Sequence, residues 1–256
     1  MDASKTLAPS ARDATLGSVS EAEHAGHARA TEKPRKTFAR FLYENGLTLV
    51  LMAMFLITML GQTLTGHVEH NNENEEHGQP TLSLPQYLVS GHFMEATAEN
   101  WESEFLQMAM FVVLTVCLRQ KGSPESKPVD GEDPVDEDPN EKRNDPNVPW
   151  PVRKGGFVLW LYSHSLSIAF AVLFLLSFAV HAWGGAKDYS EEQLAHGEAG
   201  ATTLQYMATS RFWFESFQNW QSEFLSLAAM VYLAVFLREK GSAESKPVAT
   251  PHGEQE

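Results

Sequence analysis

Two long stretches without a charged residue constrain the fold of this 256-residue chain more than any other feature. Residues 45–68 and 155–186 contain no Asp, Glu, Lys or Arg, and their centres are rich in Leu, Phe, Met and Val. A helix needs about 20 mostly apolar residues to cross the roughly 30 Å of hydrocarbon in a bilayer. A buried helix in a water-soluble core is the alternative, but such helices are usually shorter. We therefore predict transmembrane helices at about 44–66 and 157–183.

Two shorter uncharged stretches, residues 105–118 and 224–237, are each preceded by a tryptophan and followed by basic residues. These flanking residues are typical of helix ends at the two faces of a membrane. Extended outward past the tryptophans, the stretches predict further spans at about 98–120 and 217–239. The expected interface anchors are Trp101 and Trp220 at one face and Arg119 and Arg238 at the other.

The two halves of the chain repeat each other. Residues 37–129 align with residues 156–248 at a constant offset of 119 without a gap, and 33 of the 93 pairs are identical. Because each repeat holds an even number of spans, both repeats enter the membrane in the same sense. The predicted fold class is an all-α membrane protein. Four transmembrane helices form a tandem parallel repeat of a two-helix hairpin, with short interfacial helices in the outer loops.

The distribution of basic residues predicts the orientation. No Lys or Arg occurs between Phe41 and Leu118, whereas basic residues precede the first and third spans and follow the second and fourth. By the positive-inside rule, both termini and the central linker are cytoplasmic. The expected layout is a disordered tail at 1–36, membrane repeat 1 at 37–127, an acidic disordered linker at 128–152, membrane repeat 2 at 153–246 and a disordered tail at 247–256.

The charge of the chain limits its partners. The chain has 33 acidic and 19 basic side chains and a formal net charge of −14, whereas nucleic-acid binding needs a basic surface. Residues 128–149 hold eight acidic residues, two basic residues and five prolines, a composition that buries too little apolar surface to fold alone. The linker is therefore a spacer or a docking segment. The expected partners are the lipid bilayer, a second copy in a homodimer, or proteins that bind the cytoplasmic tails and linker.

A matched pair of acidic residues is expected inside the membrane. With Arg119 at the inner edge, Glu104 lies about 22 Å up its helix at 1.5 Å per residue, and Glu223 is its equivalent in the second repeat. Ionisable residues at that depth are costly and mark ion or proton pathways. Asn100 and Asn219 lie one turn earlier and could hydrogen-bond the carboxyls. These four residues are the candidate ion or proton site. The favoured alternative is that the two glutamates only form hydrogen bonds that hold the hairpins together, or that helix tilt and local bilayer thinning expose them to water.

The outer loops contain a candidate divalent-metal site. Glu73 and His77 are four residues apart, as are Glu192 and His196, and this spacing puts a carboxylate and an imidazole on one helical face. No other cofactor is predicted. The favoured alternative is an ordinary helix end, because each His is followed by a Gly that can form a left-handed cap.

Other histidines have alternative assignments. His92, Glu95 and Glu99 share a helical face, but their equivalents in the second repeat are not all metal ligands, so only a one-sided metal site could form. A solvated helix face is the favoured alternative. His164 and His181, near the two ends of the third span, are expected to be polar contacts between helices, or else part of a proton path.

Four motifs carry a family resemblance: His-Gly-Gln-Pro at 77–80, Gly-His-Phe-Met-Glu at 91–95, Asn-Trp-x-Ser-Glu-Phe-Leu at 100–106 and Lys-Gly-Ser-x-Glu-Ser-Lys at 121–127. Over residues 37–248, the chain resembles a family of bacterial membrane proteins of unknown function. The resemblance implies a multi-pass protein of the bacterial inner membrane and implies no activity.

Three functions fit these observations. The favoured one is a structural or regulatory membrane module, and the alternative is a small proton- or cation-coupled transporter or channel that uses Glu104 and Glu223. The third is a membrane enzyme with a metal held by the outer-loop histidines and glutamates. The chain has no nucleophile elbow, glycine-rich phosphate loop or Cys-x-x-Cys pair, and its single cysteine is Cys117. These features argue against an enzyme.

Overall fold

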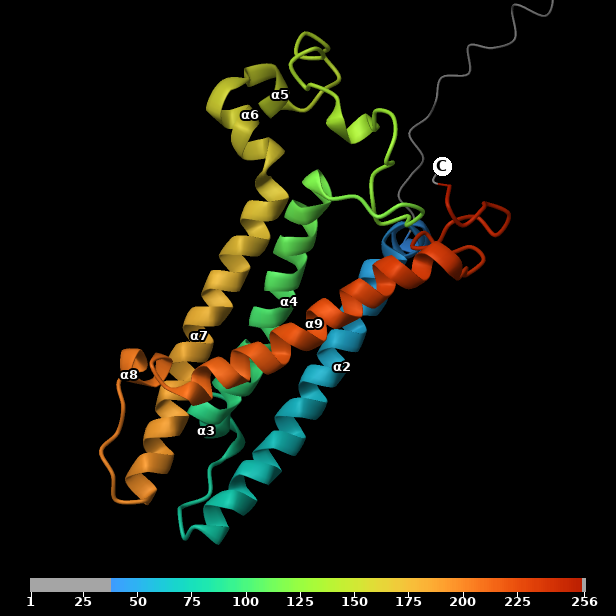
Figure 1. Cartoon of the computed structure of the whole chain (residues 1–256). Helices are drawn as coiled ribbons and strands as arrows, with labels where there is room; N and C mark the ends of the chain where they lie inside the picture. Colours follow the sequence, from blue (N-terminus) through green and yellow to red (C-terminus); the bar gives the residue numbers. More distant parts are fainter. Residues whose placement is uncertain (1–37, 255–256) are drawn as a thin grey trace, which may run out of the picture. The chain divides into compact units, whose positions relative to one another are not determined.

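The computed structural model describes residues 38–254, which form helices and turns without strands (Figure 1). The chain divides into two compact units, and the boundary between them follows Thr58, within the helix α2. The helices are α2 (Phe38–Glu76), α3 (Leu84–Tyr87), α4 (Gly91–Cys117), the 3-10 helix η1 (Pro134–Asp136), α5 (Trp150–Lys154), α6 (Gly156–Ser163), α7 (Ser165–Ala195), α8 (Thr203–Met207) and α9 (Ser210–Phe236).

Two helices, α2 and α7, are long and apolar enough to cross a membrane. In the first unit, which holds α2 as far as Thr58, the Leu, Met and Phe side chains are largely exposed. Apolar surface of this extent needs lipid or another apolar surface to cover it. α4 and α9 have 27 residues each, but charged residues interrupt their first halves. Length and composition therefore support two of the four expected spans.

Two pairs of helices in the two halves begin at residues that lie 119 positions apart. α4 begins and ends 119 residues before α9, and α3 begins 119 residues before α8. The starts of α4 and α9 are also built alike, because Ser90 and Thr209 each accept a hydrogen bond from a backbone N–H three residues later. Such caps satisfy N–H groups that have no partner within the helix. The local structure thus follows the offset that is visible in the sequence.

In the second unit, α4 packs along α7, and α9 contacts both α4 and α8 (Figure 1). The buried apolar cluster lies where α7, α8 and α9 meet, and its buried members are Ala182, Ala186, Tyr206 and Phe212. The phenyl ring of Phe212 packs edge-on to Tyr206 and lies 4.8 Å, centroid to centroid, from the imidazole of His181. The core therefore surrounds a polar side chain rather than excluding it.

The third predicted span is not one continuous helix. α6 ends at Ser163 and α7 begins at Ser165, with His164 between them. The Nδ1 atom of His164 lies 2.8 Å from the carbonyl oxygen of Trp160, and Ser165 Oγ donates to Tyr162 O. The backbone hydrogen bonds from His164 N–H to Trp160 O and from Ile168 N–H to His164 O continue across this point, so the interruption is confined to one residue.

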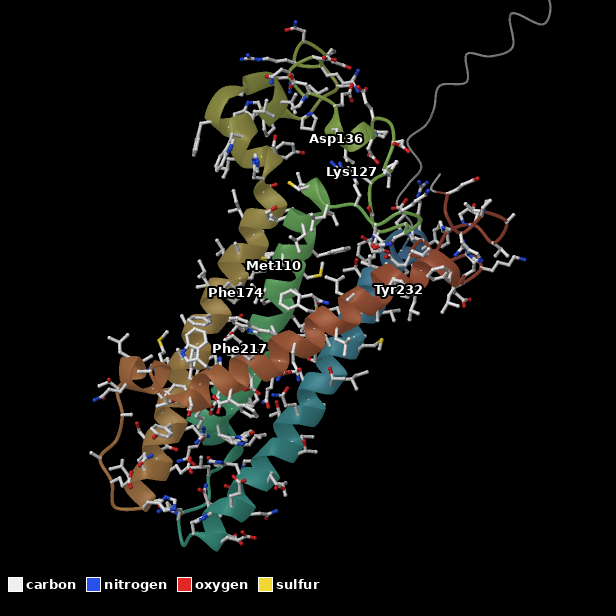
Figure 2. The ribbon with its side chains drawn as sticks, viewed as in Figure 1. Met110, Lys127, Asp136, Phe174, Phe217 and Tyr232 are labelled. Carbon is white, nitrogen blue, oxygen red and sulfur yellow. The ribbon has the colours of Figure 1, made fainter. Side chains whose placement is uncertain are left out.

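The acidic linker and the carboxyl-terminal tail, both predicted to be disordered, contain turns. Three aspartates of the linker, Asp133, Asp138 and Asp145, accept a hydrogen bond from the backbone N–H two residues later. These local bonds form turns without a hydrophobic core. Lys127 also forms an ion pair with Asp136 across 2.6 Å (Figure 2). The predicted amino-terminal tail lies outside the described residues.

Candidate metal centre

Two glycines allow α4 to approach α7 closely. A Cβ atom on Gly91 of α4 would lie 2.5 Å from the backbone nitrogen of Asp188, and one on Gly184 of α7 would lie 2.9 Å from the backbone nitrogen of Glu95. Real Cβ atoms do not come so close to backbone atoms, so neither position has room for a side chain. The close crossing brings the glutamates of α4 against His181 of α7.

His181 is fully buried, and Glu102 orients it. Its Nδ1 atom lies 2.7 Å from Glu102 Oε2, and neither side chain has any exposed surface. The other carboxylate oxygen, Oε1, accepts a hydrogen bond of 2.9 Å from Trp220 Nε1. An Nδ1–H donated to Glu102 leaves the lone pair of the neutral imidazole on Nε2. That Nε2 atom is buried and has no hydrogen-bond partner.

Two further carboxylates lie on the Nε2 side of His181. Glu215 Oε2 lies 3.6 Å from Nε2. The buried hydroxyl of Tyr206 hydrogen-bonds this same Oε2 and also Glu95 Oε1, the latter at 2.8 Å. Arg211 Nε donates to the other oxygen of Glu215 across 2.9 Å. The tyrosine therefore holds the two carboxylates next to each other beside the imidazole.

The two carboxylates differ in protonation. Burial raises the pKa of Glu95 to about 8. Burial would also raise the pKa of Glu215, but its contact with His181 and its hydrogen bonds with Tyr206 and Arg211 favour the anion, so this pKa is lowered. At neutral pH, Glu95 therefore holds a proton while Glu215 is ionised. A cation that binds here would displace that proton.

The arrangement has the chemistry of a metal site. Ligand atoms of Glu95, His181 and Glu215 all lie within 4.8 Å of one another. An imidazole nitrogen with carboxylate oxygens suits divalent transition metals such as zinc, manganese or iron. Imidazoles that bind metals usually donate their second N–H to a carboxylate, and Glu102 has that position on His181.

The predicted ion or proton site lies about one to two and a half helical turns beyond Glu95 on α4 and Glu215 on α9. Glu104 is exposed and Glu223 is half-buried, and their carboxylates interact electrostatically. Asn100 and Asn219 each donate a side-chain N–H to the backbone carbonyl four residues earlier, and Asn219 also hydrogen-bonds the Glu99 side chain. Gln107 Nε2, however, donates to the carbonyl oxygen of Glu223 at 3.0 Å. The two glutamates therefore lie near a polar contact between α4 and α9.

The predicted outer-loop metal ligands lie at helix ends. His77 and His196 are exposed, and the Nδ1 atom of each lies within 2.9 Å of the carbonyl oxygen four residues earlier. The glycines that follow, Gly78 and Gly197, have positive φ angles of 68° and 79°. This geometry is that of the capping alternative. The Glu192 carboxylate forms an ion pair with Arg211 instead.

The predicted interface anchors have additional contacts. Trp101 is 40 % exposed, whereas the indole of Trp220 donates to Glu102 in the candidate centre. Arg119 and Arg238 each donate to backbone carbonyls in the last turn of their helix, α4 and α9. A guanidinium at this position offsets the negative end of the helix dipole. Their predicted role at the membrane face is compatible with these bonds.

Three members of the centre, Glu102, Tyr206 and Glu215, were not singled out by the sequence analysis. A signal for Glu102 was present, because Glu95, Glu99 and Glu102 follow one face of a helix at positions i, i+4 and i+7. No comparable pattern pointed to Glu215, which reaches the centre through the crossing of α9 with α4 and α7.

Comparison with known proteins gives one match. The profile of a family described as a domain of unknown function, DUF6766, matches residues 38–256. No curated protein matches the chain. No solved structure matches it either.

Proposed function

The chain belongs to the DUF6766 family, a domain of unknown function, and on that premise we propose that it is a multi-pass membrane protein that binds a divalent transition-metal cation. The single observation that carries the proposal is the orientation of His181. Glu102 holds its Nδ1 atom, and the buried, unpartnered Nε2 atom lies beside Glu95 and Glu215. We name these three ligands and Glu102 the buried centre.

The energetics of burial favour a cation in the buried centre. A buried polar atom without a partner costs about 1–3 kcal/mol, and Nε2 of His181 is such an atom. In addition, five carboxyl groups interact electrostatically in this region, and the guanidinium of Arg211 pairs with two of them, Asp188 and Glu215. The carboxylates are Glu95, Glu99, Glu102, Asp188 and Glu215. A divalent cation would give Nε2 a partner and offset this excess of acid.

The membrane arrangement proposed here has four spans in two parallel hairpins, in a bacterial inner membrane, with both termini in the cytoplasm. The apolar composition of α2 and α7 supports it, as does the equivalence of the helix bounds across the offset of 119. Two contacts between equivalent residues also support a two-fold relation of the halves. Gln107 hydrogen-bonds Ser226, and Glu125 hydrogen-bonds Glu244. Residues that meet their own equivalents lie near a two-fold axis.

The distribution of polar residues favours a cation-binding protein over a transporter formed by a single copy of the chain. Beyond Gln107, α4 carries one uncharged polar side chain other than cysteine, Thr115, before it ends. Beyond Ser226, α9 carries only the polar hydroxyl of Tyr232. A cation that reached the buried centre from the outer side would therefore meet few polar side chains further along α4 and α9. This behaviour suits a structural or regulatory module that responds to a cation.

The proposal is tested by metal analysis of the full 256-residue chain in detergent. The protein is stripped with a chelator, titrated with Zn²⁺ or Mn²⁺, and compared with the variants H181Q and E215Q. Both variants should lose one equivalent of bound cation, and E102Q should weaken its binding by about 10–100-fold, the usual effect of removing an outer-shell partner. The matched control is H164Q, which alters an exposed histidine of the same region of the chain. Equal binding by wild type and H181Q would contradict the proposal.

A second candidate function is a proton- or cation-coupled carrier that uses Glu104 and Glu223. The specific observation in its favour is the bond from Gln107 to the Glu223 backbone, which joins the two helices beside these carboxylates. In liposomes, the double variant E104Q/E223Q should abolish flux while the helical content persists. Flux that is the same in wild type and double variant would remove this candidate.

A further inference from the structure

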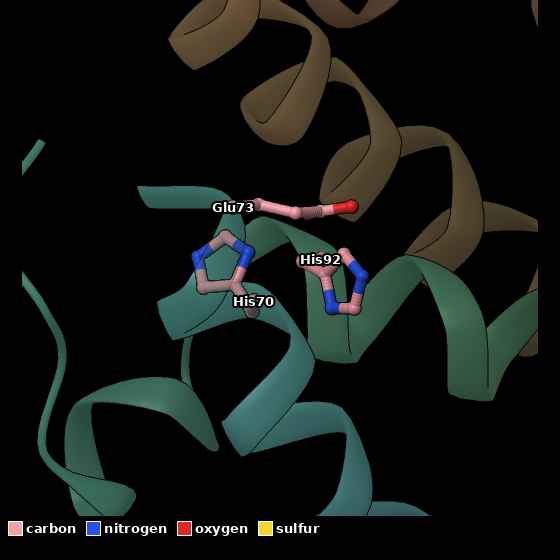
Figure 3. Close-up of side chains that lie close together, drawn as sticks. All are labelled: His70, Glu73 and His92. Carbon is pink, nitrogen blue, oxygen red and sulfur yellow. The ribbon is translucent and has the colours of Figure 1, made fainter. Parts of the chain in front are cut away.

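A second group of metal-binding side chains lies apart from the buried centre, where the end of α2 meets the start of α4 (Figure 3). It consists of His70 and Glu73 on α2 and His92 on α4, and its ligand atoms lie within 4.8 Å of one another. The two imidazole ring centroids are 4.8 Å apart. His70 is 8 % exposed, whereas Glu73 is exposed, so the group is open to a cation from solution at one side.

The residues around this group hold its ligands in the way that outer-shell residues do in metal sites. The hydroxyl of Tyr87 lies 3.2 Å from Nδ1 of His92, and Tyr87 is 1 % exposed. Gly66 leaves room for that hydroxyl, since a Cβ atom there would lie 2.3 Å from it. If Nδ1–H of His92 donates to Tyr87, the lone pair is on Nε2, as a metal ligand requires. The tyrosine thus holds the orientation of the His92 ring, and Nε2 is available to a metal when Nδ1 carries the proton.

The second repeat indicates what the first one binds. The residues equivalent to His92 and Glu73, 119 positions later, are Arg211 and Glu192, and they form an ion pair. Arg211 also contacts Asp188 and Glu215, and its guanidinium lies over the ring of Tyr189, the equivalent of His70. The second repeat therefore supplies its own cation at this place in the fold. In the first repeat, the shorter imidazole of His92 replaces the guanidinium, so a cation from solution can occupy the position of that positive charge.

We propose that His70, Glu73 and His92 form a second divalent-cation site, in which a transition-metal ion has the role that the Arg211 guanidinium has in the second repeat. Two imidazole nitrogens and one carboxylate oxygen favour zinc or a similar transition metal over magnesium or calcium, which prefer oxygen ligands. Asp188 of α7 acts electrostatically on both His70 and His92 and adds negative potential. The site shares no ligand with the buried centre, so either one can exist without the other.

The deciding experiment uses the variant H92R, which copies the second repeat into the first. An arginine can form the ion pair with Glu73 as Arg211 does with Glu192, so the fold should persist without the metal. The full chain in detergent is stripped of metal and titrated with Zn²⁺ alone, with Mg²⁺ in excess as background. The number of bound ions is counted, and circular dichroism checks the helical content. Wild type should bind one more Zn²⁺ than H92R.

Three further variants separate this site from the buried centre. H70Q should lose the same Zn²⁺ as H92R, and Y87F should weaken its binding by about 10–100-fold, as expected for an outer-shell partner. H181Q should retain it, because that variant affects the buried centre only. The matched control is H77Q, an exposed histidine one turn beyond Glu73, which should bind like wild type. The proposal is overturned if H92R binds as many ions as wild type, or if H77Q loses the ion instead.

Discussion

Gln107 and Ser226, which occupy equivalent positions 119 residues apart, are hydrogen-bonded to each other, with Nε2 of the glutamine 3.4 Å from Oγ of the serine. The contact joins α4 of the first half to α9 of the second. In the two-fold arrangement proposed above, equivalent residues meet close to the axis that relates the two halves. The bond therefore marks where the two halves of the chain come together, and residues that differ between the halves mark where their roles diverge.

The first prediction concerns the glycine beneath Tyr206. In G185A, the new Cβ atom would lie 2.5 Å from the tyrosine hydroxyl, so α8 must shift. Overpacking of this kind costs about 1–3 kcal/mol, and the thermal unfolding temperature in detergent should fall. G61A is the matched control, since no atom lies within 4 Å of its Cβ position. That variant should be neutral or up to about 1 kcal/mol more stable, because Ala favours a helix over Gly. Equal effects of the two variants would contradict the packing described here.

The second prediction concerns the hydroxyl of Tyr206. The variant Y206F removes a hydrogen bond from both Glu95 and Glu215 and leaves two buried carboxyl oxygens with fewer partners. The expected loss of stability is about 1–3 kcal/mol, measured by denaturant or thermal unfolding. Tyr232 is 59 % exposed, so Y232F should change stability by less than about 0.5 kcal/mol. If Y206F were as stable as wild type, the hydroxyl would not hold the two carboxylates together.

The third prediction is a pH dependence at a second contact of equivalent residues, Glu125 with Glu244. Burial, and then the hydrogen bond and charge of Glu244, raise the pKa of Glu125 from 4.5 to about 7. The folded chain therefore binds this proton more tightly than the unfolded chain. The stabilisation is complete below pH 4.5, declines between pH 4.5 and 7, and is lost as the pH rises through the folded value.

Hydrogen exchange measures this dependence directly. After correction for the intrinsic pH effect, exchange in residues 121–127 and 240–246 should quicken as the pH rises from 5 to 8 through that range. In E125Q, the side chain does not titrate, and the exchange rates should not change in this way. A pH effect of the same size in E125Q would assign it to another group.

The fourth prediction concerns the carboxyl-terminal segment. Lys246 is buried, and its Nζ donates to three backbone carbonyl oxygens within residues 251–254. In K246A, those carbonyls lose their donor, so proteinase K should cleave this segment faster than in wild type. The equivalent lysine, Lys127, pairs with Asp136 instead, and K127A should leave cleavage near residue 251 unchanged. Unchanged cleavage in K246A would show that the lysine does not retain the segment.

Sequence patterns predicted the parts of the fold that depend on local composition. Uncharged stretches predicted the apolar parts of the long helices, and the offset of 119 predicted that α4 and α9 would match in length. The interruption at His164 was not predicted, because residues 157–183 contain no proline or glycine that would indicate it. The alternative interpretation of His77 and His196 as helix ends could be predicted from the glycine that follows each histidine.

Only part of the candidate metal centre could be predicted from the sequence. His181 and Glu102 are 79 residues apart, and Tyr206 and Glu95 are 111 apart, so no local pattern connects them. Their contact depends on the close crossing at Gly91 and Gly184, which the spacing of apolar residues does not encode. The sequence analysis singled out Glu104 and Glu223 as candidates, because depth in a helix can be estimated from one chain segment, whereas contact between segments cannot.

The adjacent glycines of α7 have a mechanical consequence. Gly184 faces the backbone of α4, and Gly185 faces the ring of Tyr206 on α8, so neighbouring residues press on two different elements. At this level α7 is therefore enclosed on two sides, by the backbone of α4 and by the aromatic ring of α8. We expect these three helices to move together here, because a displacement of α7 alone would open or crowd both contacts.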